Sequence, residues 1–506
     1  MSAENDAAIR HTAHAQEAPP VRRDADAWRA LAFLLAYFVA YVLVRSLMPG
    51  ALDRDEAEII HLTQELQLGN GTQPPLYAWL QWLAFHGFGL ARFSLVLPKA
   101  LALVATYVLM YRLARPLVGR DAALAAAASL ALFPQIGWEA LRIQTHSVLL
   151  TTLACATLGC YVALLKKPDL PRYALLGIVC GLGMQSKYNF GVFLLGVGCA
   201  SLLVREHRQV VWNRKLWITA LLGLLVFLPH GVWMLNNMDA AFTGTVRKMQ
   251  AGNEGMAYLA RVGTGLLQVP ATLFSFLALP ACIYVALCWP LRGQIVFDRT
   301  SPASRFFLAS YATFGVLLLV LVLTGEVGVI KERWMIPLLF TLPVAVFVMF
   351  PALRTPGVCR RIRYAAYIAA LLFLALLPAR LWLAPAFGKV VSPHQPYAQL
   401  AEAIGRHCPA AQTVVTESVV SAGNLRFARP ELRTVLLDDA VREHPRLAGP
   451  VVLVTHRDRD SDAIWRPMFL AAYPDARSLR QEQVRLARRF GSPGVMGFEV
   501  GCYMMK

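Results

Sequence analysis

Charged side chains are scarce in this chain. Only 16% of its 506 residues are Asp, Glu, Lys or Arg, against roughly a quarter in an ordinary soluble domain, and 57% are hydrophobic. A chain of this composition has too few polar groups to cover the surface of a water-soluble globule. The shortage of charge therefore predicts a membrane protein.

Three further absences narrow the possibilities. No internal repeat is visible, and no low-complexity segment follows the polar first 25 residues. The first apolar run is too long for a signal-peptide core and lacks a small-residue cleavage pattern, so we expect it to stay as a membrane helix. The nine cysteines form no metal-type CxxC cluster. Cys408 and Cys502, the two in the C-terminal region, either form a disulfide in an oxidising compartment or remain buried thiols.

Apolar runs of about 20 residues, the length that crosses roughly 30 Å of hydrocarbon, occur eleven times. They lie near 29–48, 95–114, 121–137, 147–165, 173–186, 189–204, 215–235, 263–289, 305–325, 334–353 and 363–383. The sequence therefore predicts a mainly α, polytopic protein with about eleven transmembrane helices. The segment 76–90 interleaves Tyr, Trp, His and Gly with leucines, which favours a helix lying in the membrane interface rather than a span.

Basic residues gather in alternate loops. They are Arg22 and Arg23; Arg112, Arg115 and Arg120; Lys166, Lys167 and Arg172; Arg205, Arg208, Arg214 and Lys215; Arg292, Arg299 and Arg305; and Arg354, Arg360, Arg361 and Arg363. By the positive-inside rule these loops are cytoplasmic, so the other loops and the C-terminus face the periplasm. Orientation thus explains most of the net charge of +18, and no nucleic-acid partner is implied.

Composition changes near residue 384, which divides the chain into three parts. These are a cytoplasmic tail (1–28), a transmembrane domain (29–384) and a small periplasmic α/β domain (385–506). In the last part, strand-like runs at 413–416, 434–437 and 451–455 alternate with stretches of helical pattern at 398–407 and 476–489.

The loop after the first span concentrates acidic residues. Asp53, Asp55, Glu56 and Glu58 fall within six positions, where like charges repel one another and contribute nothing to folding. A membrane protein that places them beside the bilayer is expected to use at least one in chemistry. The alternatives are a solvated loop or a weak cation site.

The other external loops carry cations and polar groups. Among them are Arg142 and His146, Lys187 and Tyr188, His230, and the run Lys331-Glu332-Arg333-Trp334. Each also has an ordinary interpretation, because Lys187 could snorkel from a helix end, His146 could cap a helix, and Glu332 could pair with Arg333. Tyr188 and Trp334 could belong to an interfacial aromatic belt. We favour a site, since all these groups gather on one side of the membrane.

Several motifs occur in a fixed order along residues 29–350. They are Asp55-Glu56, Pro74-Pro75-Leu76-Tyr77, Arg92-Phe93 with Leu97-Pro98-Lys99-Ala100, Gly181-Leu182 with Ser186-Lys187-Tyr188-Asn189-Phe190, Pro229-His230 with Trp233, and Lys331-Glu332-Arg333-Trp334 with Pro337. In these motifs the chain resembles C-type membrane glycosyltransferases, the superfamily of the protein O-mannosyltransferases and the lipid A aminoarabinose transferase. It is most similar to the branch of the rhizobial lipopolysaccharide galacturonosyltransferases. Many relatives have a second aspartate at the start of the fourth span; the segment 142–147 has none, so His146 could take part of that role.

The resemblance implies an inverting enzyme of the bacterial inner membrane, with its active site facing the periplasm. It would move a sugar from a polyprenyl-phosphate donor to a periplasmic acceptor, above all lipid A or lipopolysaccharide core. Asp55 would be the general base and Glu56 its orienting neighbour. The expected substrate-binding residues are Pro75, Tyr77, Arg142, His146, Lys187, Tyr188, His230, Lys331 and Arg333.

No cofactor or metal is required by this interpretation, although a carboxylate pair could hold Mg²⁺ or Mn²⁺. A protein O-glycosyltransferase is the alternative within the same class. A polyprenyl-lipid flippase or transporter is the alternative outside it, but such a protein would show symmetry between its halves and charges near the membrane midplane.

Overall fold

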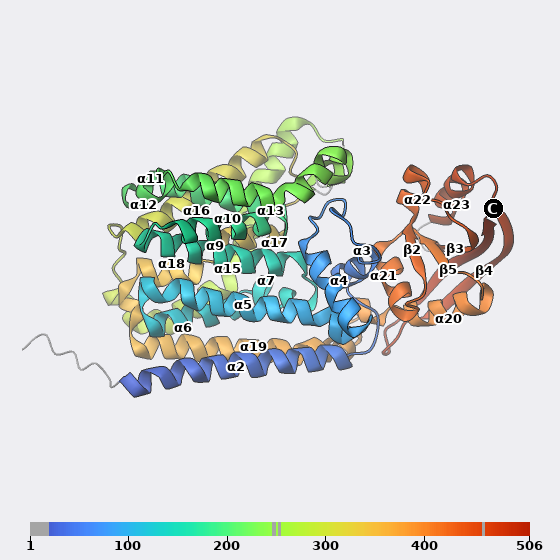
Figure 1. Ribbon diagram of the computed structural model, residues 1–506. Helices are drawn as coiled ribbons and strands as arrows, with labels where there is room; N and C mark the ends of the chain where they lie inside the picture. The colour runs from blue at the N-terminus through green and yellow to red at the C-terminus, as the bar shows by residue number, and fades with distance from the viewer. Residues whose placement is uncertain (1–19, 245–248, 251–254, 458–460, 506) are drawn as a thin grey trace, which may run out of the picture.

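Long apolar helices form the first three quarters of the chain, and a small α/β domain follows at one end of the bundle (Figure 1). The computed structural model describes residues 20–244, 249–250, 255–457 and 461–505. The helices of the bundle are α2 (Pro20–Leu47), α3 (Arg54–Leu62), α4 (Leu76–Phe88), α5 (Arg92–Val118), α6 (Arg120–Ala128), η1 (Ser129–Leu132), α7 (Pro134–Gly137), α8 (Glu139–Arg142), α9 (His146–Lys166), α10 (Leu170–Met184), α11 (Phe190–Leu203), α12 (Arg205–Val211), α13 (Leu216–Asn236), η2 (Asp239–Thr243), α15 (Tyr258–Cys288), η3 (Trp289–Gln294), α16 (Pro302–Leu323), α17 (Glu332–Leu339), α18 (Leu342–Met349), η4 (Pro351–Arg354) and α19 (Pro356–Ala386). The mainly α fold expected from the sequence is confirmed.

All eleven apolar runs fall on helices, but the helices differ in kind. In the described part of the chain, seven are long and apolar enough to cross a membrane, and two bent pairs raise the number to nine. The remaining two runs form α10 and α11, which have only 15 and 14 residues. The count of eleven spans therefore stays a prediction. Helix α2 begins at Pro20, earlier than the predicted span, and residues 1–19 of the predicted tail lie outside the described residues.

Proline accounts for the position of the sharper bend. The run 121–137 is broken at Phe133, where the axis turns by 80° between Arg120–Leu132 and Pro134–Arg142. Pro134 has no N–H to continue the preceding helix, but it suits the first turn of a new one. The bend carries α8 and Arg142 to the end of the bundle near α3, so a break in one span supplies residues to the site described below.

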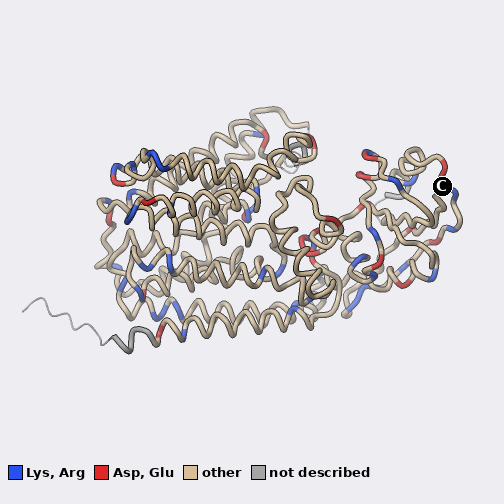
Figure 2. The backbone as a smooth tube through the Cα atoms, in the orientation of Figure 1, with Lys and Arg blue, Asp and Glu red and all other residues tan. Residues whose placement is uncertain are grey.

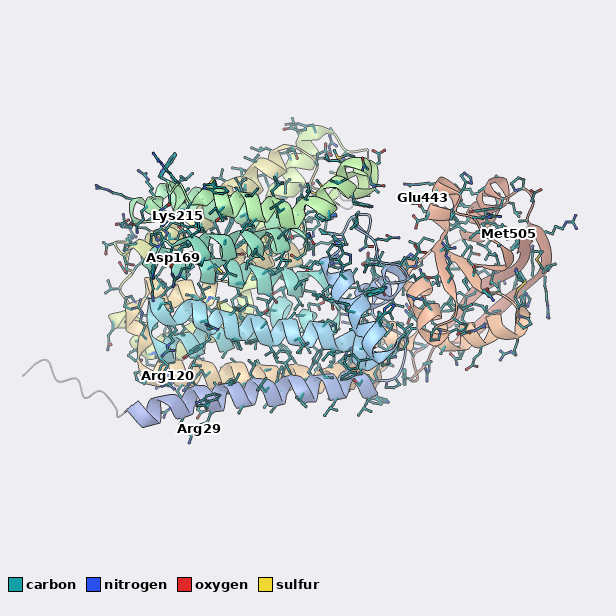
Figure 3. All side chains as sticks on the ribbon, in the orientation of Figure 1. Arg29, Arg120, Asp169, Lys215, Glu443 and Met505 are labelled. Carbon is teal, nitrogen blue, oxygen red and sulfur yellow. A yellow bond between two sulfur atoms is a disulfide. The ribbon has the colours of Figure 1, made fainter. Side chains whose placement is uncertain are left out.

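Charged residues gather at the two ends of the bundle. Figure 2 shows few Lys, Arg, Asp or Glu along the middle of the helices and many at their ends. Arg29, Arg120 and Lys215 lie at the end opposite Glu443 and Met505 of the α/β domain (Figure 3). We call the end with Arg29, Arg120 and Lys215 the basic end. The end next to the α/β domain, which carries α3 and α4, is called the loop end. Helix α4 has 13 residues, too few to span a bilayer, as expected for an interface helix.

The α/β domain contains one five-stranded sheet of order β2-β1-β3-β5-β4. Its elements are η5 (Ser392–His394), α20 (Tyr397–His407), β1 (Thr413–Thr416), α21 (Val419–Ala428), β2 (Arg433–Leu436), α22 (Leu437–Glu443), β3 (Gly449–His456), α23 (Ser461–Ala472), β4 (Arg477–Ala487) and β5 (Val495–Met505). Strands β2, β1 and β3 are parallel, whereas β5 and β4 are antiparallel to their neighbours. Cys408 and Cys502 form a disulfide that joins the end of α20 to β5.

One predicted helix is wrong. Residues 476–489 are rich in Arg, Gln, Glu, Leu and Ala, which favour helix, yet 477–487 form strand β4. Strand β4 is an exposed edge strand that pairs along its length with β5, so it has no buried face to impose a period on its sequence. Pairing with β5 decides its conformation, and the residues of β4 themselves do not record that pairing.

Helix α21 joins the α/β domain to the bundle by lying across α3. A side chain on Gly423 would collide with the backbone of Ala57, so glycine permits this close approach. The Asn424 side chain accepts a hydrogen bond from the Leu52 N–H at 2.7 Å, and Arg426 donates to the Ile60 carbonyl. The acidic loop is thereby held between the bundle and the domain.

Candidate active site

Asp55 and Arg333 meet at the loop end. Their nearest atoms, Oδ2 of Asp55 and Nη1 of Arg333, are 3.4 Å apart, and the side chains are 15% and 35% exposed. Glu332 does not pair with Arg333, because its carboxylate accepts hydrogen bonds from Gln135 and Ser275 on neighbouring helices. The suggested pairing of Glu332 with Arg333 is therefore wrong, and Arg333 reaches an acid 278 positions away in sequence.

Arg333 also lines a cavity of about 340 Å³. The polar side chains of its wall are Thr72, Gln73, Lys187, Tyr188, Asn189, Lys331 and Arg333. The apolar ones are Val192, Met249, Leu318, Leu321, Val327, Ile330, Trp334, Met335 and Leu338, which come largely from α11, α16 and α17. Four predicted substrate-binding residues, Lys187, Tyr188, Lys331 and Arg333, are thus brought together with a hydrocarbon surface. Such a cavity suits a ligand with an anionic head and an apolar tail.

The loop between α10 and α11 places two of these groups. The Lys187 ammonium donates to Ser147 Oγ at 2.7 Å, so this side chain is fixed against α9 rather than only extended towards the membrane surface. Burial raises the pKa of Tyr188 to about 12, so its hydroxyl remains protonated and can donate a hydrogen bond. The Leu76 N–H donates to the Gln185 carbonyl at 3.2 Å, which connects the turn containing Pro75 to this loop.

The remaining predicted residues lie around the cavity rather than on its wall. Tyr77 is buried with its ring 5.2 Å from that of His146, centroid to centroid, and Pro75 is buried at the start of α4. His230 stacks between Tyr188 and Trp233 and contacts the Leu68 carbonyl through Nδ1 at 2.8 Å. This arrangement indicates that His230 supports Tyr188 and the loop after α3.

Glu56 points away from the cavity into the protein. It is 1% exposed, with Arg45 Nη2 at 2.5 Å from Oε2 and Lys99 Nζ at 3.3 Å from Oε1. Burial by itself would raise the pKa of Glu56, but the charges of Arg45 and Lys99 outweigh burial and hold that pKa below its ordinary value. Its catalytic assignment is untested and stays a prediction; the contacts fit a supporting role better than direct contact with substrate.

A second buried pair lies beside the first. Asp53 Oδ2 is 2.5 Å from Arg380 Nη2, and its other oxygen is 3.8 Å from Arg142 Nη1, which also pairs with Glu139. Arg45, Lys99 and Arg380 are not among the site residues predicted from the sequence. The available signal was the position of each in an apolar run, since ionisable residues within spans usually serve a function.

The carboxylates of the loop fit poorly as a metal cage. Asp53, Asp55 and Glu56 each face a Lys or Arg side chain, which already neutralises the charge that would attract a divalent cation. The described residues contain no group of three or more His, Cys, Asp and Glu side chains placed to hold a metal.

Comparison with known proteins shows which glycosyltransferases this chain is similar to. The family described as dolichyl-phosphate-mannose-protein mannosyltransferase matches residues 72–233. Two proteins of Rhizobium johnstonii are similar over most of the chain. Lipopolysaccharide core galacturonosyltransferase RgtA is 32% identical over 476 residues, covering 91% of this chain and 94% of the relative. Lipopolysaccharide core galacturonosyltransferase RgtB is 32% identical over 431 residues, covering 84% and 86%.

A solved structure shares the fold. The crystal structure of ArnT from Cupriavidus metallidurans, bound to undecaprenyl phosphate, matches with a TM-score of 0.61 and 14% identity. The match covers 92% of this chain and 97% of that one, so it includes both the bundle and the terminal domain.

Proposed function

Because the chain belongs to the C-type membrane glycosyltransferases, in the branch of the lipopolysaccharide core galacturonosyltransferases, we propose that it transfers galacturonic acid to a lipopolysaccharide acceptor. The donor is a polyprenyl phosphate that carries the sugar. The observation that carries this proposal is the cavity in which Lys187, Lys331 and Arg333 stand beside an apolar wall, with Asp55 in contact with Arg333. Core oligosaccharide is the preferred acceptor, and lipid A is the next.

The donor occupies the cavity with its phosphate at the three cations and its isoprenoid chain along α11 and α16. Transfer breaks the bond between the anomeric carbon and the phosphate oxygen, so a second negative charge develops on the leaving phosphate. Lys187 and Lys331 supply point charges for it, Arg333 can bind two of its oxygens, and Tyr188 can donate a hydrogen bond. In a partly dry site such preorganised groups stabilise the transition state more than the bound donor.

Asp55 is the proposed general base. The acceptor hydroxyl attacks the anomeric carbon from the face opposite the phosphate and loses its proton to the Asp55 carboxylate, which inverts the configuration. Arg333 contacts Asp55 at 3.4 Å before the donor arrives, and the donor phosphate competes for the same guanidinium. Donor binding therefore loosens the ion pair and leaves Asp55 ready to accept a proton. A phosphate acceptor, already anionic, would need no such base.

The site faces the periplasm in this proposal, and the protein lies in the inner membrane. Two observations support this orientation: the basic loops lie at the end opposite the α/β domain, and that domain carries the Cys408–Cys502 disulfide. A reporter fused after residue 390 should be active only outside the cytoplasm, and one fused at residue 361 only inside. Activity of the first fusion in the cytoplasm would contradict the orientation.

Purified protein tests the reaction directly. In detergent, with a polyprenyl-phosphate donor radiolabelled in the sugar, label should move into lipopolysaccharide core oligosaccharide. The Asp55→Asn protein serves as the control of strongly reduced activity. Label in a protein acceptor instead would make the enzyme a protein O-glycosyltransferase. Absence of transfer to any acceptor, with Lys187-dependent exchange between leaflets in vesicles, would identify a flippase and overturn the proposal.

A further inference from the structure

Two buried ion-pair clusters connect the first turn of α3 to the helix bundle. Glu56 contacts Arg45 of α2 and Lys99 of α5, and Asp53 contacts Arg380 of α19. All five side chains are less than a tenth exposed. Ion pairs thereby join the first turn of this nine-residue helix to three separate membrane helices.

The Asp53 side chain does not cap α3 but contacts Arg380 instead. It occupies the N-cap position of α3, where an aspartate side chain normally accepts a hydrogen bond from the first turn, yet no such cap bond forms. Its backbone carbonyl accepts from the N–H groups of Glu56 and Ala57, and its carboxylate turns to Arg380 instead. The Asp53–Arg380 contact therefore replaces a local N-cap hydrogen bond, which would have stabilised the helix without burying a second charge.

The positions of the acids around the helix explain what the contacts accomplish. Asp53 and Glu56 are three residues apart and share one face of the first turn, whereas Asp55 projects from a different side, where it meets Arg333. Fixing the first face fixes the rotation of α3 about its axis. The rotation in turn determines whether the Asp55 carboxylate lies at the edge of the cavity.

Stability alone is a weak reason for such an arrangement. Removing ions from water opposes most of the attraction within a buried pair, and apolar residues of similar size often stabilise a fold as well or better. The clusters also include the segment before α9: Tyr41 Oη and Lys99 Nζ both donate to the Leu141 carbonyl, at 2.9 Å and 3.4 Å. The network is therefore directional, and direction is what a catalytic base requires.

We propose that Arg380, Arg45 and Lys99 are positioning residues that act through Asp53 and Glu56 to hold the Asp55 carboxylate in its reactive place. The inference rests on the proposed role of Asp55 as the base. A displacement of about 1 Å in a reacting group can lower a rate about a hundredfold, so loss of one contact should reduce turnover without removing donor binding.

A double-mutant cycle between positions 380 and 55 tests the inference. Arg380→Met should lower kcat about 10- to 100-fold with little change in KM for the donor, and Arg380→Lys should restore part of the loss. In an Asp55→Asn background, Arg380→Met should reduce the residual transfer no further, because the group it positions is already inactive. Arg354, half-buried at the basic end, supplies the control: any effect of Arg354→Met should be the same in both backgrounds.

Equal multiplicative losses from Arg380→Met in both backgrounds would overturn the positioning inference and leave the proposed function intact. Near-normal transfer by Asp55→Asn alone would overturn the role of Asp55, and the inference with it. If Arg380→Met protein fails to accumulate in the membrane, Arg380→Lys and Asp53→Asn supply the same cycle with smaller changes in volume and charge. Transfer rates are compared only between variants that insert into the membrane and have the same thermal stability.

Discussion

Replacing Arg333 by alanine should disable transfer while leaving the fold intact. Arg333 both lines the cavity and contacts Asp55, so the proposed mechanism assigns it to the leaving phosphate. A unit charge about 4 Å from the guanidinium is attracted by roughly 4 kcal/mol at an effective dielectric constant of about 20. Because the side chain is 35% exposed, water weakens this attraction, and about 2–3 kcal/mol is a realistic difference between bound donor and transition state.

That difference corresponds to a fall in kcat of roughly 30- to 150-fold for Arg333→Ala. Arg333→Lys keeps the charge but loses the paired donors, so we expect a fall of about tenfold. The assay follows label from the polyprenyl-phosphate donor into the acceptor at saturating donor. Arg54→Ala is the matched control, since Arg54 is an exposed arginine next to Asp55, and its kcat should stay within about twofold of wild type.

Two results would refute this reasoning. If Arg333→Ala and Arg54→Ala show the same small effect, the phosphate is bound elsewhere. If Arg333→Ala raises KM for the donor and leaves kcat unchanged, Arg333 contributes equally to the bound donor and the transition state, and it does not stabilise the developing charge.

Three further predictions follow from the same geometry. Asp55→Asn should fold and insert but lower turnover about a hundredfold or more, and normal turnover with a hydroxyl acceptor would exclude Asp55 as the base. Leu321→Trp, in the apolar wall, should raise KM for long-chain donors more than for short-chain ones, whereas Leu319→Trp, on the exposed side of the same helix, should not; equal effects would contradict the placement of the isoprenoid chain. Burial, aided by the charge of Arg426, lowers the pKa of His61 to about 4. His61 therefore stays neutral while α3 is in contact with the α/β domain, whereas an exposed histidine binds a proton below about pH 6.5. Contact between α3 and the α/β domain should therefore weaken as pH falls from about 6.5 towards 4, with lower protection from hydrogen exchange in α21 and β2 relative to unstructured chain at the same pH. His61→Gln should remove this dependence, and protection equal at both pH values would refute it.

Local composition determined most of the helices. An apolar run of membrane length has few stable alternatives to helix, because backbone groups in hydrocarbon must bond within their own segment. The short helix α4 and the small α/β domain were predictable from sequence pattern, and the ordered motifs led to the glycosyltransferase family. Strand β4 was not predictable, because its conformation depends on pairing with β5 and its own residues favour helix.

The sequence by itself also identified the acids and cations of the site as candidates. Charged residues are rare in segments that contact hydrocarbon, so each one is conspicuous in the sequence. Only the tertiary structure decided which acid meets which cation. Asp53, Asp55 and Glu56 look alike in sequence, yet they face Arg380, Arg333 and the Arg45–Lys99 pair, because a single turn of helix directs neighbouring side chains to different sides. Lys99, Arg333 and Arg380 lie 43, 278 and 327 positions from the acids that they meet, and no local pattern records that choice.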